Sequence, residues 1–118
     1  VDRAVEGDHS GFGDRPADSL ACLPVDAPYL ANVDLVTTDI PVFNGQRRTA
    51  LARFGQIVDM EGAAVVRTAA WFGVPCTLLK GVTDPAGSGD RQQLLVNIDP
   101  VAEALADLLM DLIGAQAI

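Results

Sequence analysis

The sequence predicts an α/β domain built on a largely parallel sheet. Three observations support this prediction. Predicted strands and helices alternate along the chain, which favours parallel strands joined by helices. Residues 74–83 form an apolar run, as expected of a strand covered on both faces. The composition is 49% hydrophobic but only 5% aromatic, which suits small side chains packed closely between helices and a sheet.

The first third of the chain predicts loops followed by one strand. Glycine, proline and aspartate are frequent in residues 1–32, so we expect irregular structure there, with at most a short helix or turn. Residues 33–38 (VDLVTT) predict a strand, and 39–44 (DIPVFN) predict the loop that follows it. Pro41 lacks a backbone donor and therefore belongs beyond the strand's end. Residues 45–54 predict a short helix.

The middle of the chain predicts a strand and a buried helix. Residues 56–59 (QIVD) form the expected strand, and residues 60–72 are apolar or small at nearly every position, as in a helix buried on more than one side. Asp59 is the expected N-cap of this helix, and Gly73 is the expected residue just beyond its C-terminus.

The last third predicts a strand, a turn and a helix. The strand at 74–83 ends before Asp84, and the proline- and glycine-containing segment after it predicts a turn. The final helix is expected over 99–113, with Asp99 as its cap, Pro100 at its first position and Gly114 at its end.

The overall properties indicate one domain over residues 1–118 and exclude several functions. Sixteen acidic residues against eight basic ones give a net charge of −8, which disfavours nucleic-acid binding. No apolar run reaches the roughly 18 residues of a membrane helix, and no signal peptide is visible, so we expect a cytoplasmic protein without a membrane partner. The two cysteines, Cys22 and Cys76, have no metal-ligand spacing and predict no disulfide framework.

Polar residues follow each predicted strand in the second half of the chain. They are the 39–44 loop, Asp59-Met60-Glu61, and Thr83-Asp84. Ligands of open α/β sheets bind at the carboxyl ends of strands, so three parallel neighbours would bring these groups to one cleft. Lys80 interrupts the apolar run, and we interpret it as reaching a sheet edge. Arg47, Arg48 and Arg53 are interpreted as a solvated helix face.

Two carboxyl groups are the strongest candidates for chemistry. Glu61, in the predicted first turn of a helix, would stay ionised and could accept hydrogen bonds from two neighbouring hydroxyls. Asp84 ends an apolar strand, where partial desolvation would make it a usable acid. Each also has a structural interpretation, because acids complement helix N-termini and aspartates initiate turns before proline. Asp8, His9 and Ser10 have the residue types of a hydrolase triad, but adjacent residues rarely converge on one site.

Two segments together resemble the nucleoside phosphorylase/nucleosidase superfamily. VDMEGAAVVRTAAWFGVPCTLLKGVTD (58–84) is similar to its signature region, with Met-Glu before a small-residue helix and a Ser/Thr-Asp pair after the next strand. LVTTDIPVFNG (35–45) resembles its strand and base-pocket loop, and EGDHSGFG (6–13) weakly resembles the preceding loop. Within the superfamily, the likeness is greatest to methylthioadenosine/S-adenosylhomocysteine nucleosidases. It implies a three-layer α/β/α fold with a mixed, largely parallel sheet.

The resemblance also implies residue roles. Glu61 would bind the ribose 2′- and 3′-hydroxyls, and Met60 would pack against the sugar. Asp84 would be the catalytic residue that donates a proton to purine N7, helped by Thr83. Val42 and Phe43 would border the base. The partner implied is a purine nucleoside, and neither a cofactor nor a metal is implied.

The likeness covers about half of a usual family domain, so we expect the C-terminal part of one. The family's activating glutamate and glycine-rich phosphate-side loop lie nearer the N-terminus and are not found in this sequence. We therefore expect weak or no catalysis by this chain alone, and either a homo-oligomer or a complementing N-terminal half. A nucleosidase is the favoured function. A nucleoside-binding or assembly module without turnover and a purine nucleoside phosphorylase remain alternatives.

Overall fold

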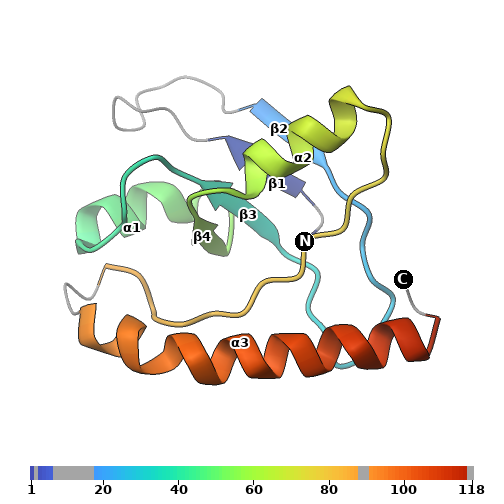
Figure 1. Cartoon of the computed structure of the whole chain (residues 1–118). Helices are drawn as coiled ribbons and strands as arrows, with labels where there is room; N and C mark the ends of the chain where they lie inside the picture. The colour runs from blue at the N-terminus through green and yellow to red at the C-terminus, as the bar shows by residue number, and fades with distance from the viewer. Residues whose placement is uncertain (2, 7–17, 88–90, 117–118) are drawn as a thin grey trace.

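The sheet of this computed structural model contains four strands in the order β2-β1-β3-β4, within the described residues 1, 3–6, 18–87 and 91–116 (Figure 1). β1 (Arg3–Glu6) pairs antiparallel with β2 (Asp18–Ala21) and parallel with β3 (Asp34–Thr37), which pairs parallel with β4 (Ile57–Asp59). The predicted mixed, largely parallel sheet is confirmed.

Strands β1 and β2 correct the prediction of irregular structure over 1–32, which is confirmed for residues 22–32. Each strand has four residues, RAVE and DSLA, which is too short and too polar for a periodic signal. Their conformation is stabilised by pairing instead, since β1 lies between β2 and β3. Ala4 and Val5 of β1 are buried.

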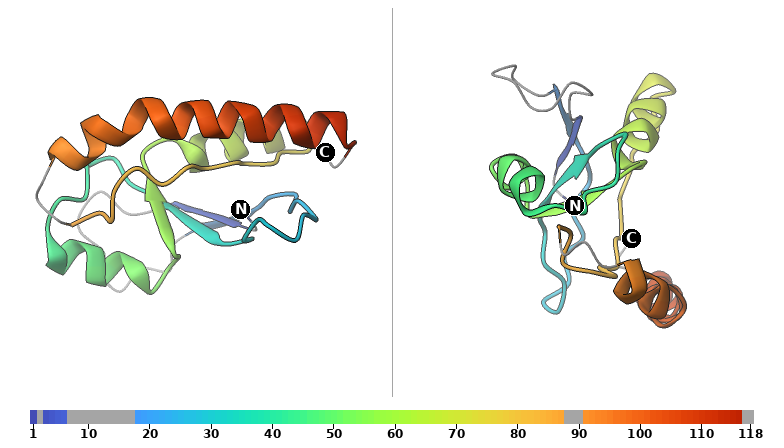
Figure 2. Two further views of the ribbon diagram at one scale, coloured as in Figure 1. Left: turned by 90° about the horizontal axis from the view of Figure 1, so that it is seen from below. Right: turned by 90° about the vertical axis from the view of Figure 1, so that its left-hand side faces the viewer.

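Two helices cover opposite faces of the sheet and produce the three layers seen in Figure 2. Alternate residues of β3 face opposite sides. Leu35 packs in a core with Ala63 and Val66 of α2 (Gly62–Trp71), whereas Val36 packs with Leu51 of α1 (Gly45–Ala52). The alternation within this one strand therefore places α1 and α2 on different faces.

The ends of α1 and α2 agree with the expected boundaries to within about two residues. Asn44 caps α1 by accepting a 2.8 Å hydrogen bond from the Arg47 amide. After α2, Gly73 adopts a φ of 65°, and the amides of Gly73 and Val74 bond back to Ala70 and Ala69. This pairing is a Schellman motif, so glycine terminates α2 as the sequence predicts.

Residues 74–83 are not a strand, which corrects the sequence prediction. The segment is bound by isolated contacts, among them Leu23 N to Cys76 O at 2.8 Å and the Val1 ammonium to Leu78 O at 3.2 Å. An apolar run becomes a strand only where it forms a continuous ladder, and these isolated contacts do not extend the sheet beyond β2 or β4. The segment instead runs between the sheet and the last helix (Figure 1).

The last helix, α3 (Arg91–Gly114), begins eight residues before the expected start. The Asp99-Pro100 pair suggested an N-terminus, but Pro100 lies inside the helix. Residues 91–95 (RQQLL) are good helix formers and extend it towards the N-terminus. α3 packs through Leu112, which is fully buried against Val25 and Ala27. No helix in the described ranges has the length and apolarity needed to cross a bilayer.

Candidate functional site

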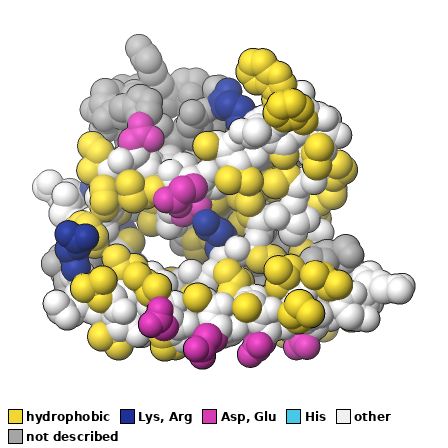
Figure 3. Space-filling view, viewed as in Figure 1, with side chains coloured by type: hydrophobic (Ala, Val, Ile, Leu, Met, Phe, Trp, Pro, Cys, Tyr) yellow, Lys and Arg dark blue, Asp and Glu magenta, His cyan; other side chains and the backbone are white. Residues whose placement is uncertain are grey.

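A cavity of about 760 Å³ lies at the carboxyl ends of β3 and β4. The space-filling view shows the molecule hollowed above α3, with acidic and basic side chains near the opening (Figure 3). The three polar segments predicted to converge do meet around this cavity. Its lining includes all six site residues named from the sequence: Val42, Phe43, Met60, Glu61, Thr83 and Asp84.

The loop after β3 forms one wall of the cavity. The Thr38 hydroxyl donates a 2.9 Å hydrogen bond to the Ile40 carbonyl, which fixes the turn out of the strand. Val42 is buried and packs with Val36 and Leu51, so it is anchored in the core beneath α1. Phe43 is half-buried, and the Arg91 guanidinium lies 5.7 Å from its ring centroid. Both residues border the cavity, Val42 from the core and Phe43 from the loop.

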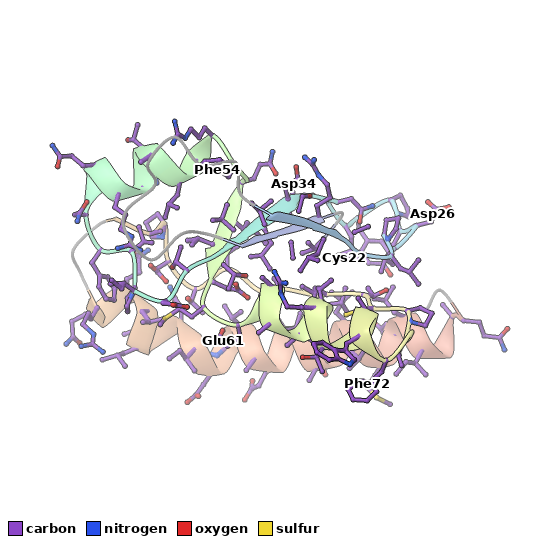
Figure 4. All side chains as sticks on the ribbon, turned by 90° about the horizontal axis from the view of Figure 1, so that it is seen from above. Cys22, Asp26, Asp34, Phe54, Glu61 and Phe72 are labelled. Carbon is purple, nitrogen blue, oxygen red and sulfur yellow. The ribbon has the colours of Figure 1, made fainter. Side chains whose placement is uncertain are left out.

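Met60 and Glu61 occupy the connection between β4 and α2. The sequence predicts Glu61 in the first turn of the helix. The helix instead begins at Gly62, so Glu61 is the N-cap residue. Its backbone has φ −131° and ψ −26°, and its side chain makes no capping hydrogen bond. Figure 4 shows Glu61 where the chain enters α2, at the opposite end of the helix from Phe72. Both Met60 and Glu61 are exposed and line the cavity.

Asp59 connects the elements around Glu61. Its Oδ1 accepts a 2.7 Å hydrogen bond from the Thr37 hydroxyl, and its Oδ2 accepts a 2.8 Å bond from the Gly62 amide. The Lys80 ammonium lies 2.7 Å from the same Oδ2. The sequence predicts Asp59 as the cap of this helix and suggests that Lys80 reaches a sheet edge. Lys80 instead lines the cavity and pairs with Asp59.

Asp84 is half-buried and held by its own loop. The Thr83 hydroxyl donates to Oδ1 at 2.8 Å, and the Ala86 amide donates to Oδ2 at 3.2 Å. The loop is fixed at two further points, because Asn97 of α3 donates to the Thr83 carbonyl at 2.7 Å and the Gly87 amide donates to Val42 O at 2.9 Å. The second contact connects the Asp84 loop directly to the Val42 wall.

The arginines of α1 and its C-cap do not form the uniformly solvated face that the sequence suggested. Arg48 lines the cavity, and the Nε of half-buried Arg47 has no hydrogen-bond partner in the described part of the chain. Arg53 lies over the Phe54 ring, 4.7 Å from its centroid. Helical periodicity alone did not distinguish these environments, because the loop that approaches α1, residues 83–87, is distant in sequence.

Some sequence candidates cannot be placed. Asp8, His9 and Ser10 lie outside the described residues, as does most of the EGDHSGFG segment. Neither Cys22 nor Cys76 is in a disulfide bond. Within the described ranges, no three His, Cys, Asp or Glu side chains gather as a metal site would require.

Comparison with known proteins bears on the same residues. No curated protein and no solved structure matches the chain. The family model described as "Phosphorylase superfamily" matches residues 28–114, which include β3, α1, β4, α2 and all of α3. The match also spans every residue placed around the cavity by the sequence analysis. The chain therefore belongs to the phosphorylase superfamily, the family of nucleoside phosphorylases and nucleosidases.

Proposed function

We propose that the cavity binds a purine nucleoside and that the chain carries the ribose-binding and proton-donating part of a nucleosidase. The substrates favoured are adenosine-type nucleosides such as methylthioadenosine or S-adenosylhomocysteine. The observation that carries the proposal is that Glu61 and Asp84, from separate segments, line one cavity of about 760 Å³. One carboxyl group can bind a diol while the other protonates a leaving base.

The ribose side is assigned to Glu61 and Met60. The Glu61 carboxylate makes no capping bond, so both of its oxygens are available to accept hydrogen bonds from the 2′- and 3′-hydroxyls. Met60 is 43% exposed beside it and offers an apolar contact for the sugar ring. An ionised carboxylate at this point would also stabilise positive charge as it develops on the ribose.

The base side is assigned to Asp84, Thr83, Phe43 and Val42. Asp84 would donate its proton to purine N7, and the Thr83 hydroxyl would orient the carboxyl group. The C1′–N9 bond then breaks with its electron pair on the base, and the ribose acquires oxocarbenium character, as in O-glycoside cleavage. Water adds to C1′ and releases a proton. Phe43 and Val42 would enclose the purine ring.

Base release tests this assignment. Methylthioadenosine and inosine are incubated with the chain and with Asp84→Asn, with and without phosphate, and free base is measured. Phosphate-independent turnover that is lost in Asp84→Asn would establish a nucleosidase and contradict our expectation of an inactive isolated chain. Turnover only with phosphate would identify a phosphorylase. Binding without turnover, weakened by Glu61→Ala, would support an incomplete site or a binding module. If the chain neither binds nor cleaves these nucleosides, the proposal is overturned.

We also propose that the chain acts in a cytoplasmic homo-oligomer or with a complementing N-terminal half. Large apolar side chains at the end of α2 support this, since Trp71 is 84% and Phe72 75% exposed. Exposed apolar surface of this kind favours association. Sedimentation should show self-association or aggregation, whereas a stable, compact monomer would contradict the proposal.

A further inference from the structure

We infer that Asp59 is a positioning residue that caps α2 in place of Glu61 and thereby leaves the Glu61 carboxylate free for ribose. This inference rests on the proposed function of the cavity. It concerns a residue that contacts no substrate in our assignment and acts only through its neighbour.

Glu61 stands where a helix normally receives its cap. The residue at the N-cap usually accepts hydrogen bonds from the first unpaired backbone amides of the helix. Glu61 has the backbone position but makes no such bond with its side chain. A carboxylate engaged in capping would turn back onto the helix, and it could not also bind a diol with both oxygens.

Asp59 and Thr37 satisfy the first amides of α2. Asp59 Oδ2 accepts from the Gly62 amide at 2.8 Å, and the Thr37 hydroxyl accepts from the Ala63 amide at 2.8 Å. The same hydroxyl donates to Asp59 Oδ1 at 2.7 Å, so the two side chains form one connected cap. Thr37 is buried and Asp59 has a side chain only 9% exposed, which holds this network in place.

Lys80 and Gly62 complete the arrangement. The Lys80 ammonium pairs with Asp59 Oδ2 at 2.7 Å, so the charge of this largely buried carboxylate is compensated. Gly62 lets the carboxylate approach the helix, because a β-carbon at that position would lie 2.7 Å from Asp59 Oδ2. Asp59 and Gly62 are therefore fixed around Glu61, while the Glu61 side chain makes no capping bond.

Loss of Asp59 should redirect Glu61. Without the Asp59 carboxylate, the Gly62 amide loses its acceptor, while Thr37 can still accept from the Ala63 amide. The Glu61 carboxylate stands at the N-cap, where it can turn back onto the start of the helix. Glu61 would then be drawn back from the cavity. The effect should appear in recognition of the ribose hydroxyls and not in recognition of the base.

The test measures the diol preference, defined as the ratio of the dissociation constants for 2′,3′-dideoxyadenosine and adenosine. Calorimetry of the full chain gives this ratio for wild type, Asp59→Ala and Asp59→Asn. We expect Asp59→Ala to reduce the preference by about tenfold. Asp59→Asn should keep most of it, because an amide oxygen can still accept from the Gly62 amide. Asp34→Ala removes a paired carboxylate from the far end of β3 and should leave the ratio unchanged.

Several outcomes decide the inference. A folded Asp59→Ala protein that keeps the wild-type preference would overturn it, and so would an Asn variant as impaired as the Ala variant. If Asp59→Ala does not fold, Thr37→Val replaces it, since this near-isosteric change removes the hydroxyl between Asp59 and the Ala63 amide. An unchanged ratio in Thr37→Val would then overturn the inference, and a reduced ratio would support it. A wild-type protein without any diol preference would overturn the proposed function itself.

Discussion

The hydroxyl of Thr83 donates a 2.8 Å hydrogen bond to Oδ1 of Asp84, the residue that follows it in the chain. The contact fixes one oxygen of the proposed acid, while Oδ2 receives only the longer 3.2 Å bond from the Ala86 amide. Oδ2 is therefore the oxygen more easily turned towards a purine. The positions of both residues depend on the loop contacts to Val42 and Asn97.

Removal of the Thr83 hydroxyl should weaken recognition of the base. In Thr83→Val the Asp84 carboxyl group loses its orienting donor, and we expect adenine to bind about tenfold more weakly. Thr83→Ser keeps the hydroxyl and should bind adenine nearly as wild type does. Calorimetric titration with free adenine measures both. Equal affinities for the Val and Ser variants would show that the hydroxyl does not orient the base contact.

A methyl group at Gly62 should destabilise the fold. The added β-carbon would lie 2.4 Å from Leu35 Cδ2 and 2.7 Å from Asp59 Oδ2, so the core and the α2 cap must both shift. We expect Gly62→Ala to lower the free energy of unfolding by roughly 1–3 kcal/mol in urea titrations. Gly45→Ala is the control, because nothing lies within 4 Å of the added carbon there. Equal stability of the two variants would contradict the packing described for Gly62.

The Arg3–Asp34 ion pair should make stability depend on acid pH. The hydrogen bond from the Arg3 side chain and its charge hold the pKa of Asp34 below its ordinary value, although partial desolvation opposes the shift. Because the pKa of Asp34 is lower in the folded state, the ion pair stabilises the fold at pH values above the unfolded-state pKa of about 4. This stabilisation is lost as the pH falls through the folded-state pKa.

The variant Arg3→Gln tests this dependence. We expect it to lower the free energy of unfolding at pH 7 by less than about 1 kcal/mol, because the Arg3 side chain is 56% exposed and screened by solvent. The difference from wild type should shrink as the pH is lowered through the folded-state pKa of Asp34, because the carboxyl group then becomes protonated in the folded state as well as in the unfolded state. Chemical unfolding at several pH values measures it. A difference that stays constant over this range would show that the ion pair is not its source.

Truncation of Leu112 should detach α3 from the rest of the domain. Leu112 is fully buried in a cluster with Val25 and Ala27, so Leu112→Ala leaves a cavity and should cost about 2–5 kcal/mol of unfolding free energy. Met110→Ala is the control on the same helix, because Met110 is 68% exposed. Thermal unfolding compares them. If both variants melt alike, α3 is not held by the Leu112 contact.

Local sequence patterns were sufficient for the middle of the fold. The strand before Thr38, the helices α1 and α2, and the glycine end of α2 carry periodicity, caps and breakers within a few residues of themselves. The same local patterns also identified the segments around the cavity, because polar residues that follow parallel strands meet at one edge of the sheet. The six site residues within these segments were named because the segments resemble those of a known family.

Features set by distant partners were not predictable in this way. β1 depends on pairing with β3, and β2 on pairing with β1, whereas residues 74–83 join no ladder although they are apolar. Pro100 marked a helix start locally, although the preceding residues extend α3 past it. The Asp59–Lys80 pair joins residues on separate segments, and the only local signal was a single lysine within an apolar run.

The most direct test of the central claim is the diol preference of wild type and Glu61→Gln, measured by calorimetric titration with adenosine and 2′,3′-dideoxyadenosine. Glutamine keeps the size of the side chain but has a single neutral acceptor oxygen. We predict that wild type binds adenosine at least about tenfold more tightly than the dideoxy compound, and that Glu61→Gln loses most of this difference without losing adenine binding. Equal wild-type affinity for the two nucleosides, or a preference that survives in Glu61→Gln, would contradict it.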